Sequence, residues 1–431
     1  MFRTISNFVR VADIRQKIVF TLLMLIVFRI GTFITVPFTD RNAIDFMNEQ
    51  SVFGLLNTFG GGALQNFSIL AMGIMPYITA SIIMQLLQMD VVQKFSEWKK
   101  QGEMGRKKLA QVTRYATIVL AFIQACAMSV GFNAMSGGML ITDPGVGKFM
   151  VIAIVLTAGT AFLMWLGEQI TAHGVGNGIS IIIFAGIAAG IPNGINQIYA
   201  QYFGSGSGDD LFINIIIVSL IVLLVLAVIV GVIFIQQALR KIPVQYAKRI
   251  VNRSPVGGHT THLPLKVNAA GVIPVIFAIS FIIAPRTIAQ FFEGNQIANT
   301  IASIFDYTNA TGMIIYVALI IAFTYFYTFV QVNPEQMADN LKKQGGYIPG
   351  IRPGKTTETY LTRVMYRLTF VGALFLAAIA VLPLVLGPVA NLPQTVQIGG
   401  TGLLIVVGVA LQTMKQLEGQ LVKRNYKGFI Q

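Results

Sequence analysis

The nearest match to a nucleotide-binding motif in this chain is a glycine-containing loop at 350–356, which reads Gly-Ile-Arg-Pro-Gly-Lys-Thr. A phosphate loop needs glycines so that backbone N–H groups reach the phosphates, and it joins a strand to a helix. Here Pro349 stands where the motif requires glycine, and the flanking sequence shows no strand-to-helix context. We therefore expect no ATP binding at this loop.

Histidines and carboxylates are the other residues that could carry chemistry. His173, His259 and His262 lie in connections between apolar runs, and the pair His259 and His262 has no acidic or cysteine neighbour to complete a metal site. The 17 acidic residues fall in loops or at the edges of apolar runs, whereas ion-coupled transport needs a charged ligand within the membrane. The sequence thus predicts no metal, no cofactor and no enzymatic activity. Arg29 is the one basic residue well inside an apolar run, and we expect it to snorkel or to bond backbone carbonyls.

The segments that must position these residues are long apolar runs. Only 11% of the 431 residues are charged, against roughly 25% in soluble domains, and 55% are hydrophobic. The apolar residues form blocks close to the ~20 residues that cross a bilayer. The sequence predicts an all-α polytopic membrane protein with ten spans, near 18–37, 70–89, 115–132, 149–167, 178–199, 211–235, 267–284, 313–332, 368–387 and 398–414.

The basic residues predict the orientation of these spans. Most of the 31 lysines and arginines lie before the first span, after the last, and in the 2–3, 6–7 and 8–9 connections. Lysine and arginine are retained on the cytoplasmic side, so both termini are expected in the cytoplasm. A polar, Gly-rich linker at 201–210 separates an N-terminal half, 1–200, from a C-terminal half, 211–431. Five spans in each half predict two inverted halves with a pathway between them.

Three features favour a gate rather than a passive wall. Pro76 in the second span and Pro274 in the seventh each interrupt a helix among small residues, one in each half. The segment 53–67 is too short to span but too apolar for a free loop, and we expect it to re-enter the protein from outside. Irregular backbone at membrane depth requires surrounding protein or a water-filled cavity, so this segment is a candidate plug or constriction.

The cytoplasmic connections near 236–266 and 333–367 are longer than a membrane turn needs and carry much of the positive charge. This charge is open to two interpretations. It could serve only to set the topology, or it could dock an acidic or nucleic-acid partner.

Six segments of the chain together resemble the SecY family of protein-conducting channel subunits. The resemblance covers nearly the whole chain, and its motifs lie at 27–31, 73–78, 165–171, 176–180, 261–268 and 338–343. It implies an hourglass-shaped channel in the bacterial cytoplasmic membrane, between two five-helix halves. The channel would open across the membrane for secreted chains and sideways for membrane helices.

The resemblance also implies roles for individual residues. The narrow waist would be an aliphatic ring of Ile74, Ile78, Ile179, Ile183, Ile276 and Ile405. The plug would include Leu55, Leu56, Phe59, Gly60, Gly61, Gly62, Leu64 and Phe67. The lateral gate would lie between spans 2, 3, 7 and 8, with Thr79, Gln85, Asn268 and Ala284. Partners would dock on Arg240, Lys241, Lys248, Arg249, Arg352 and Lys355.

The implied partners are the SecE and SecG subunits, the SecA motor ATPase, the ribosome, membrane lipids, and nascent polypeptides that carry signal sequences. The function we infer from the sequence is a passive, gated channel for polypeptides, driven by a cytoplasmic partner. The alternative is an inverted-repeat secondary transporter of a small solute, which would require charged or polar groups at mid-membrane. An intramembrane enzyme is a third reading, but a nucleophile with its base and a metal cluster are both missing from the sequence.

Overall fold

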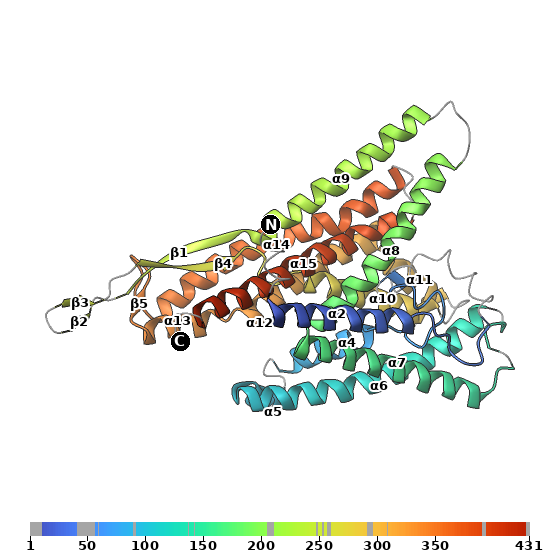
Figure 1. Ribbon diagram of the computed structural model, residues 1–431, viewed down its shortest axis with the longest axis horizontal. Helices are drawn as coiled ribbons and strands as arrows, with labels where there is room; N and C mark the ends of the chain where they lie inside the picture. Colours follow the sequence, from blue (N-terminus) through green and yellow to red (C-terminus); the bar gives the residue numbers. More distant parts are fainter. Residues whose placement is uncertain are drawn as a thin grey trace.

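The computed structural model describes most of the chain as a bundle of long helices with a small sheet at one end (Figure 1). The described residues are 11–40, 57–58, 60–88, 92–136, 138–141, 143–204, 211–246, 249–251, 254–256, 260–290, 296–307, 309–389 and 394–427.

The helices of the first half follow the apolar runs. They are α2 (Ala12–Gly31), α4 (Met75–Leu87), α5 (Gln93–Lys100), α6 (Glu103–Met135), α7 (Val146–His173) and α8 (Gly178–Phe203). Helix α7 packs against α2, α6 and α8, and α6 also packs against α4. Small residues permit the closest approaches: a Cβ built on Gly167 of α7 would lie 3.2 Å from the Ile179 side chain of α8.

The second half consists of α9 (Leu211–Gln237), α10 (Ile273–Gln290), α11 (Gln296–Ile304), α12 (Ala310–Gln331), α13 (Pro334–Lys343), α14 (Lys355–Val389) and α15 (Gln394–Lys427). Helices α10, α12, α14 and α15 pack in chain order. The halves meet where α10 packs on α4 and where α15 packs on α8. Helix α8 of the first half also packs on α9 of the second half, and α15 packs on both of them.

Each predicted span overlaps one helix, but several bounds differ. Six of the described helices are long and apolar enough to cross a membrane, while Met75–Leu87 and Ile273–Ile283 are shorter apolar helices. Helix α2 begins six residues before the predicted span and ends at Gly31. Helices α4 and α10 begin five and six residues later than predicted, because each is preceded by a turn with a left-handed glycine, described below. Hydropathy alone does not detect such a turn within an apolar run.

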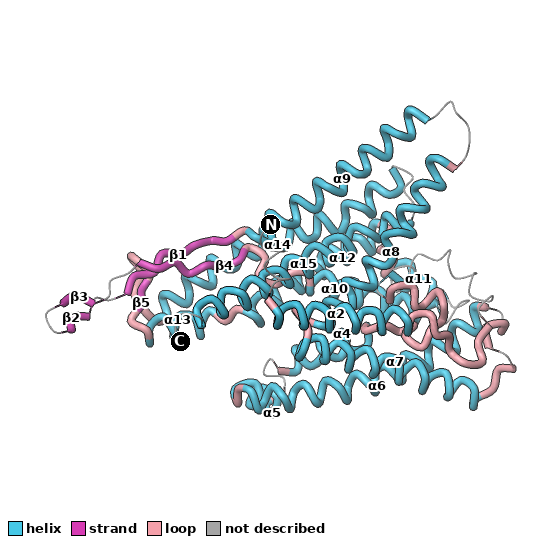
Figure 2. The backbone as a smooth tube through the Cα atoms, viewed as in Figure 1, coloured by secondary structure: helices cyan, strands magenta, loops and turns pink. Residues whose placement is uncertain are grey.

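The two long basic connections, 236–266 and 333–367, are largely regular structure in their described residues. The first contains β1 (Leu239–Tyr246) and β4 (Thr260–Lys266), which pair antiparallel, and a second hairpin of β2 (Arg249–Val251) and β3 (Ser254–Val256). The other connection contributes α13, the start of α14, and β5 (Gly346–Tyr347), which pairs with β1 in a sheet of order β4-β1-β5. Figure 2 shows the strands gathered at one end of the helices.

This sheet packs on its neighbouring helices through a core of its own. The core consists of Ile242, Val244, Leu265, Leu341, Ile348, Leu361 and Met365, all buried. Alternate residues of β1 face this core, as expected of a strand with one buried face. The two connections thus form one folded unit in the described residues, a feature that the sequence analysis did not predict. His262 lies in β4, His173 is the last residue of α7, and His259 lies outside the described residues.

Candidate functional site

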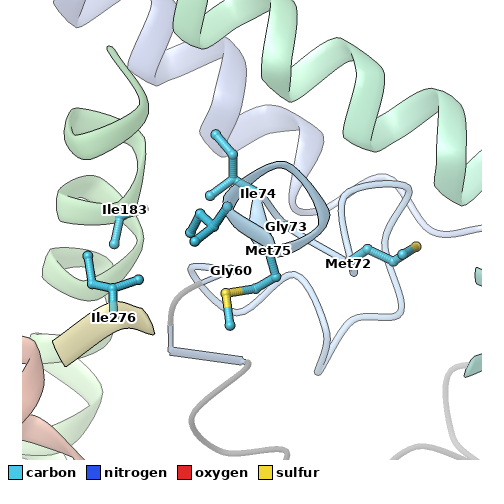
Figure 3. Close-up of a pocket in the computed structure, with 8 residues that line it drawn as sticks. Gly60, Met72, Gly73, Ile74, Met75, Ile183 and Ile276 are labelled. Atoms are coloured by element: carbon cyan, nitrogen blue, oxygen red, sulfur yellow. The ribbon is translucent and has the colours of Figure 1, made fainter. Parts of the chain in front are cut away.

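A small apolar cavity lies where the first-half helices meet α10. It measures about 10 Å³ and is lined by Gly60, Met72, Gly73, Ile74, Met75, Ile78, Ile183 and Ile276. Figure 3 shows Ile183 and Ile276 facing Ile74 across this space. A water molecule needs roughly 10–15 Å³ and two or more polar partners, and the side chains here offer none. The cavity is thus too small and too apolar to hold a column of water.

A second, larger cavity of about 340 Å³ adjoins the first on the side of the sheet. Its apolar lining includes Ile183, Ile276, Ile405 and Val272. Its polar lining comes from seven amide or amine side chains and one hydroxyl, those of Gln236, Lys266, Asn268, Gln331, Gln412, Lys415, Gln416 and Ser180. No carboxylate is among these described lining residues. The larger cavity is therefore suited to water and to a polypeptide backbone.

Ile183 and Ile276 line both cavities and so form the partition between them. Five of the six isoleucines assigned to the waist, namely Ile74, Ile78, Ile183, Ile276 and Ile405, are buried members of one hydrophobic cluster. Ile179 is partly buried at the start of α8, packs against the same cluster and against Gly167 of α7, and lines neither cavity. The ring of all six isoleucines stays a prediction.

The turns before α4 and α10 have the same construction. Gly73 and Gly271 have left-handed φ values of 58° and 67°, and a proline follows each three residues later, at Pro76 and Pro274. The N–H of Gly73 donates to the carbonyl of Leu70 at 2.8 Å, while that of Gly271 donates to the side chain of Asn268 at 2.9 Å. Glycine adopts a left-handed conformation without steric cost, and proline suits the first turn of a helix.

This correspondence points to a further candidate for the waist, which the sequence analysis did not name. Ile74 and Ile78 follow Gly73 by one and five residues, as Val272 and Ile276 follow Gly271. Val272 is buried in the same hydrophobic cluster and lines the larger cavity, on the opposite side of the partition from Ile74. The signal was present in the sequence as two Gly-x-x-Pro motifs, one in each half.

The described part of the plug segment consists of a base and a tip. The base contains Leu64 and Phe67, both buried, with the Phe67 ring edge-on to Phe132 at 6.0 Å between centroids. The tip is Gly60, Gly61 and Gly62, and Gly60 lines the small cavity. The predicted plug residues Leu55, Leu56 and Phe59 lie outside the described residues.

Arg29 lies at the end of α2 beside this tip. Its guanidinium donates a hydrogen bond to the carbonyl of Gly61 at 2.5 Å and lies over the Phe33 ring, 4.8 Å from its centroid. Arg29 therefore bonds a backbone carbonyl that belongs to the plug segment and not to a helix.

The polar residues assigned to the lateral gate make local contacts. The Thr79 hydroxyl donates to the carbonyl of Met75 at 3.1 Å, and the Asn268 amide donates to the carbonyl of Gly271 at 3.0 Å. Gln85 donates to Ser81 at 3.4 Å, and its buried Oε1 has no partner within the part of the chain that the structure describes. Ala284 lies in α10, and its side chain is outside the described set.

The described basic residues assigned to docking lie on the folded unit that the two basic connections form. Arg240 and Lys241 of β1, Arg352 and Lys355 are exposed. Around Arg352, Gly350 and Gly354 have left-handed φ values of 80° and 106°, and the Arg352 carbonyl accepts a hydrogen bond from Thr357 at 2.9 Å. The loop is thus held in a defined shape. Arg249 lies in β2 with its side chain not described, and Lys248 falls outside the described residues.

Comparisons with known proteins agree on one family. The family described as SecY matches residues 68–414. A relative from Bacillus licheniformis named protein translocase subunit SecY is 71% identical over 431 residues, covering 100% of both chains.

Solved structures share the fold. One, described by the role of the SecY plug domain in stabilising the closed translocation channel and maintaining a membrane seal, has a TM-score of 0.60 at 20% identity, covering 95% of this chain and 92% of the other. Sec61 in the canine ribosome-channel complex from the endoplasmic reticulum has a TM-score of 0.58 at 19% identity, covering 95% and 93%.

Proposed function

The chain belongs to the SecY family, and from this membership we propose that it is a gated channel for secretory polypeptides that also releases transmembrane helices sideways into the bacterial cytoplasmic membrane. The channel hydrolyses nothing itself. The observation that carries this proposal is the apolar constriction of about 10 Å³ beside a polar cavity of about 340 Å³. A constriction of branched apolar side chains resists hydration and blocks ions, yet its side chains can move aside for an extended polypeptide.

The alternative function, transport of a small solute, is disfavoured by the same geometry. An inverted-repeat transporter binds its substrate near mid-membrane with helix ends and polar or charged groups. Here the constriction is lined by isoleucine, methionine and glycine among the described residues, and both lysines of the larger cavity lie beyond the partition.

Photocrosslinking of a stalled secretory chain tests the channel directly. A photoreactive residue at Ile78 or at Ile405 should crosslink to the stalled chain, since Ile78 lines the constriction and Ile405 lines the larger cavity that adjoins it. The matched control is Leu223 of α9, whose side chain is 67% exposed on the outside of the bundle and should crosslink to lipid. Equal crosslinking at Leu223 and Ile78 would contradict the channel.

The ten-span topology with two inverted halves and cytoplasmic termini remains part of the proposal. The matching turns at Gly73 and Gly271 support it, because they give the two halves equivalent residues on opposite sides of the partition. The basic 2–3, 6–7 and 8–9 connections support a cytoplasmic location for the sheet and for both ends of the chain.

We assign the lateral gate to the seam between α4 with α6 and α10 with α12, where α4 packs on α10. A disulfide between Thr79→Cys and a cysteine near Ile276 should block lateral exit of signal sequences, and reduction should restore it. If the oxidised double variant releases signal sequences as fast as the reduced one, the gate lies elsewhere. The background for this experiment is Cys126→Ser, because Cys126 is the chain's one native cysteine.

We assign partner docking to the folded cytoplasmic unit that carries Arg240, Lys241 and Arg352. The ribosome-bound channel complex among the similar folds supports a ribosome as one partner. The family resemblance adds the SecA motor, and the SecE and SecG subunits within the membrane. Exposed arginines and lysines suit both phosphate and carboxylate surfaces.

A further inference from the structure

The plug segment is held to the rest of the protein in two different ways. At its base, the N–H of Val36 donates to the carbonyl of Phe67 at 3.0 Å, and the N–H of Ile69 donates to the carbonyl of Ile34 at 2.9 Å. Asn66 adds a side-chain bond to the carbonyl of Thr32 at 3.3 Å. With Phe67 fully buried as well, the base is fixed by both backbone pairing and packing.

The tip has far fewer attachments. Gly60, Gly61 and Gly62 carry no side chains to bury, and the backbone hydrogen bonds of the tip among the described residues run within the segment, to residues such as Asn57, Thr58 and Asn66. The bond from Arg29 to the Gly61 carbonyl comes instead from α2. The Gly61 backbone is also close to α8, because a Cβ built there would lie 3.1 Å from the Cα of Gly186.

We propose that Arg29 is a positioning residue that latches the plug tip over the constriction in the resting channel. In this proposal, the tip moves away from the constriction when the channel opens, and the base stays paired with the segment after α2. A hydrogen bond from a charged donor is among the stronger single contacts in a protein. In a low-dielectric setting, water does not replace the bond when it breaks, so the carbonyl is left without a partner. The cation–π contact with the Phe33 ring also restricts the orientation of the guanidinium.

This latch rests on the proposed function and is tested by the accessibility of the constriction in the resting translocase. In a Cys126→Ser background, the reporter is Met75→Cys, since Met75 lines the small cavity together with Gly60. The probe is a membrane-impermeant maleimide added to intact cells from outside. Arg29→Gln should raise the labelling rate by about tenfold, the effect expected for loss of one charge-assisted hydrogen bond.

The matched control is Asn66→Ala, which removes a side-chain bond between the same two segments at the base. Its labelling rate should equal that of the parent, because the backbone pairs of Val36 and Ile69 remain. An unchanged rate for Arg29→Gln, or an equal rise for Asn66→Ala, would overturn the latch.

A second variant covers a failure of Arg29→Gln to accumulate in the membrane. Arg29→Met keeps an unbranched side chain at this position but has no hydrogen-bond donor, so faster labelling supports the latch and a parental rate overturns it. Crosslinking of a stalled secretory chain at Ile78 should persist in every variant. If the labelling rate of the Arg29 variants equals that of the parent while the crosslink at Ile78 persists, this inference alone is rejected. If the parent itself gives no crosslink at Ile78, the channel is rejected.

Discussion

The two cavities share Ile183 and Ile276 but differ in size and in the polarity of their lining, and so in how much water they can hold. The smaller is closed by isoleucines and glycines and has room for about one water molecule at most. The larger is more than thirty times its volume and is lined by amides and amines. One row of side chains therefore separates a region that must stay dry from one that must stay wet, and the seal depends on the shape and hydrophobicity of very few residues.

The largest expected effect comes from placing polar side chains on both sides of the partition. Replacing both Ile78 and Ile405 by Asn gives water hydrogen-bonding partners on each side of the partition, so the closed state should hydrate. We expect resting ion conductance in planar bilayers to rise on the order of tenfold, and secretion of substrates with poor signal sequences to improve, because less binding energy is needed to open the channel.

The control for this variant is Leu223→Asn on the exposed face of α9. A double variant that inserts normally and conducts no more than the parent or this control would show that the isoleucines do not face the pore.

A smaller effect should follow from thinning the partition without adding polarity. Ile276→Ala leaves a void between the cavities, at a cost of about 2 kcal/mol in the free energy of unfolding. This is the low end for such substitutions, because lipid is as apolar as the core and mainly the cavity term remains. Unfolding in detergent mixtures measures the stability loss, and a modest rise in resting conductance should accompany it. A fully parental conductance would mean that the partition lies elsewhere.

The wet side should tolerate the same kind of truncation. Gln412 lines the larger cavity and is exposed, so Gln412→Ala should change the free energy of unfolding by less than about 0.5 kcal/mol. Resting conductance should match the parent within error. A leak comparable to that of Ile276→Ala would remove the distinction between the two cavities.

The smallest effect on the seal should come from the docking loop. Arg352→Ala should impair motor-driven secretion in reconstituted vesicles, while resting conductance and stability stay at parental values, because an exposed charge contributes little to folding. Normal secretion by this variant would remove Arg352 from the docking surface. Lys107→Ala, on the separate basic surface of α6, controls for a general loss of positive charge.

Hydropathy located the helices because a spanning segment must be apolar along its length, and each predicted span overlaps a helix. It misplaced the starts of α4 and α10, whose preceding turns are as apolar as the helices that follow. The sheet was not predicted from the sequence. A proline removes a backbone donor from a central strand, and among the described residues β5 pairs only with Gln245 and Tyr246 of β1, so Pro243 pairs with β4 alone.

The candidate site shows a similar limit. The resemblance predicted a ring of six isoleucines; five are buried in one cluster, whereas the burial of Ile179 depends on how closely α8 packs on α7. The contact of Arg29 with Gly61 joins residues 32 positions apart. Nothing in the local pattern around either residue specifies that pairing.

Helix α14 begins one residue after Gly354 of the docking loop and continues without proline as far as Leu382. At Gly372 it touches the chain just before α10, since a Cβ built there would lie 2.9 Å from the carbonyl of Val267. Seventeen residues of helix separate Lys355 from that contact, a rod of about 26 Å. Helix α14 packs on α12 and α15. If partners dock on the loop as proposed, this helix would carry a displacement of the loop to the segment just before α10, the helix assigned to the lateral gate.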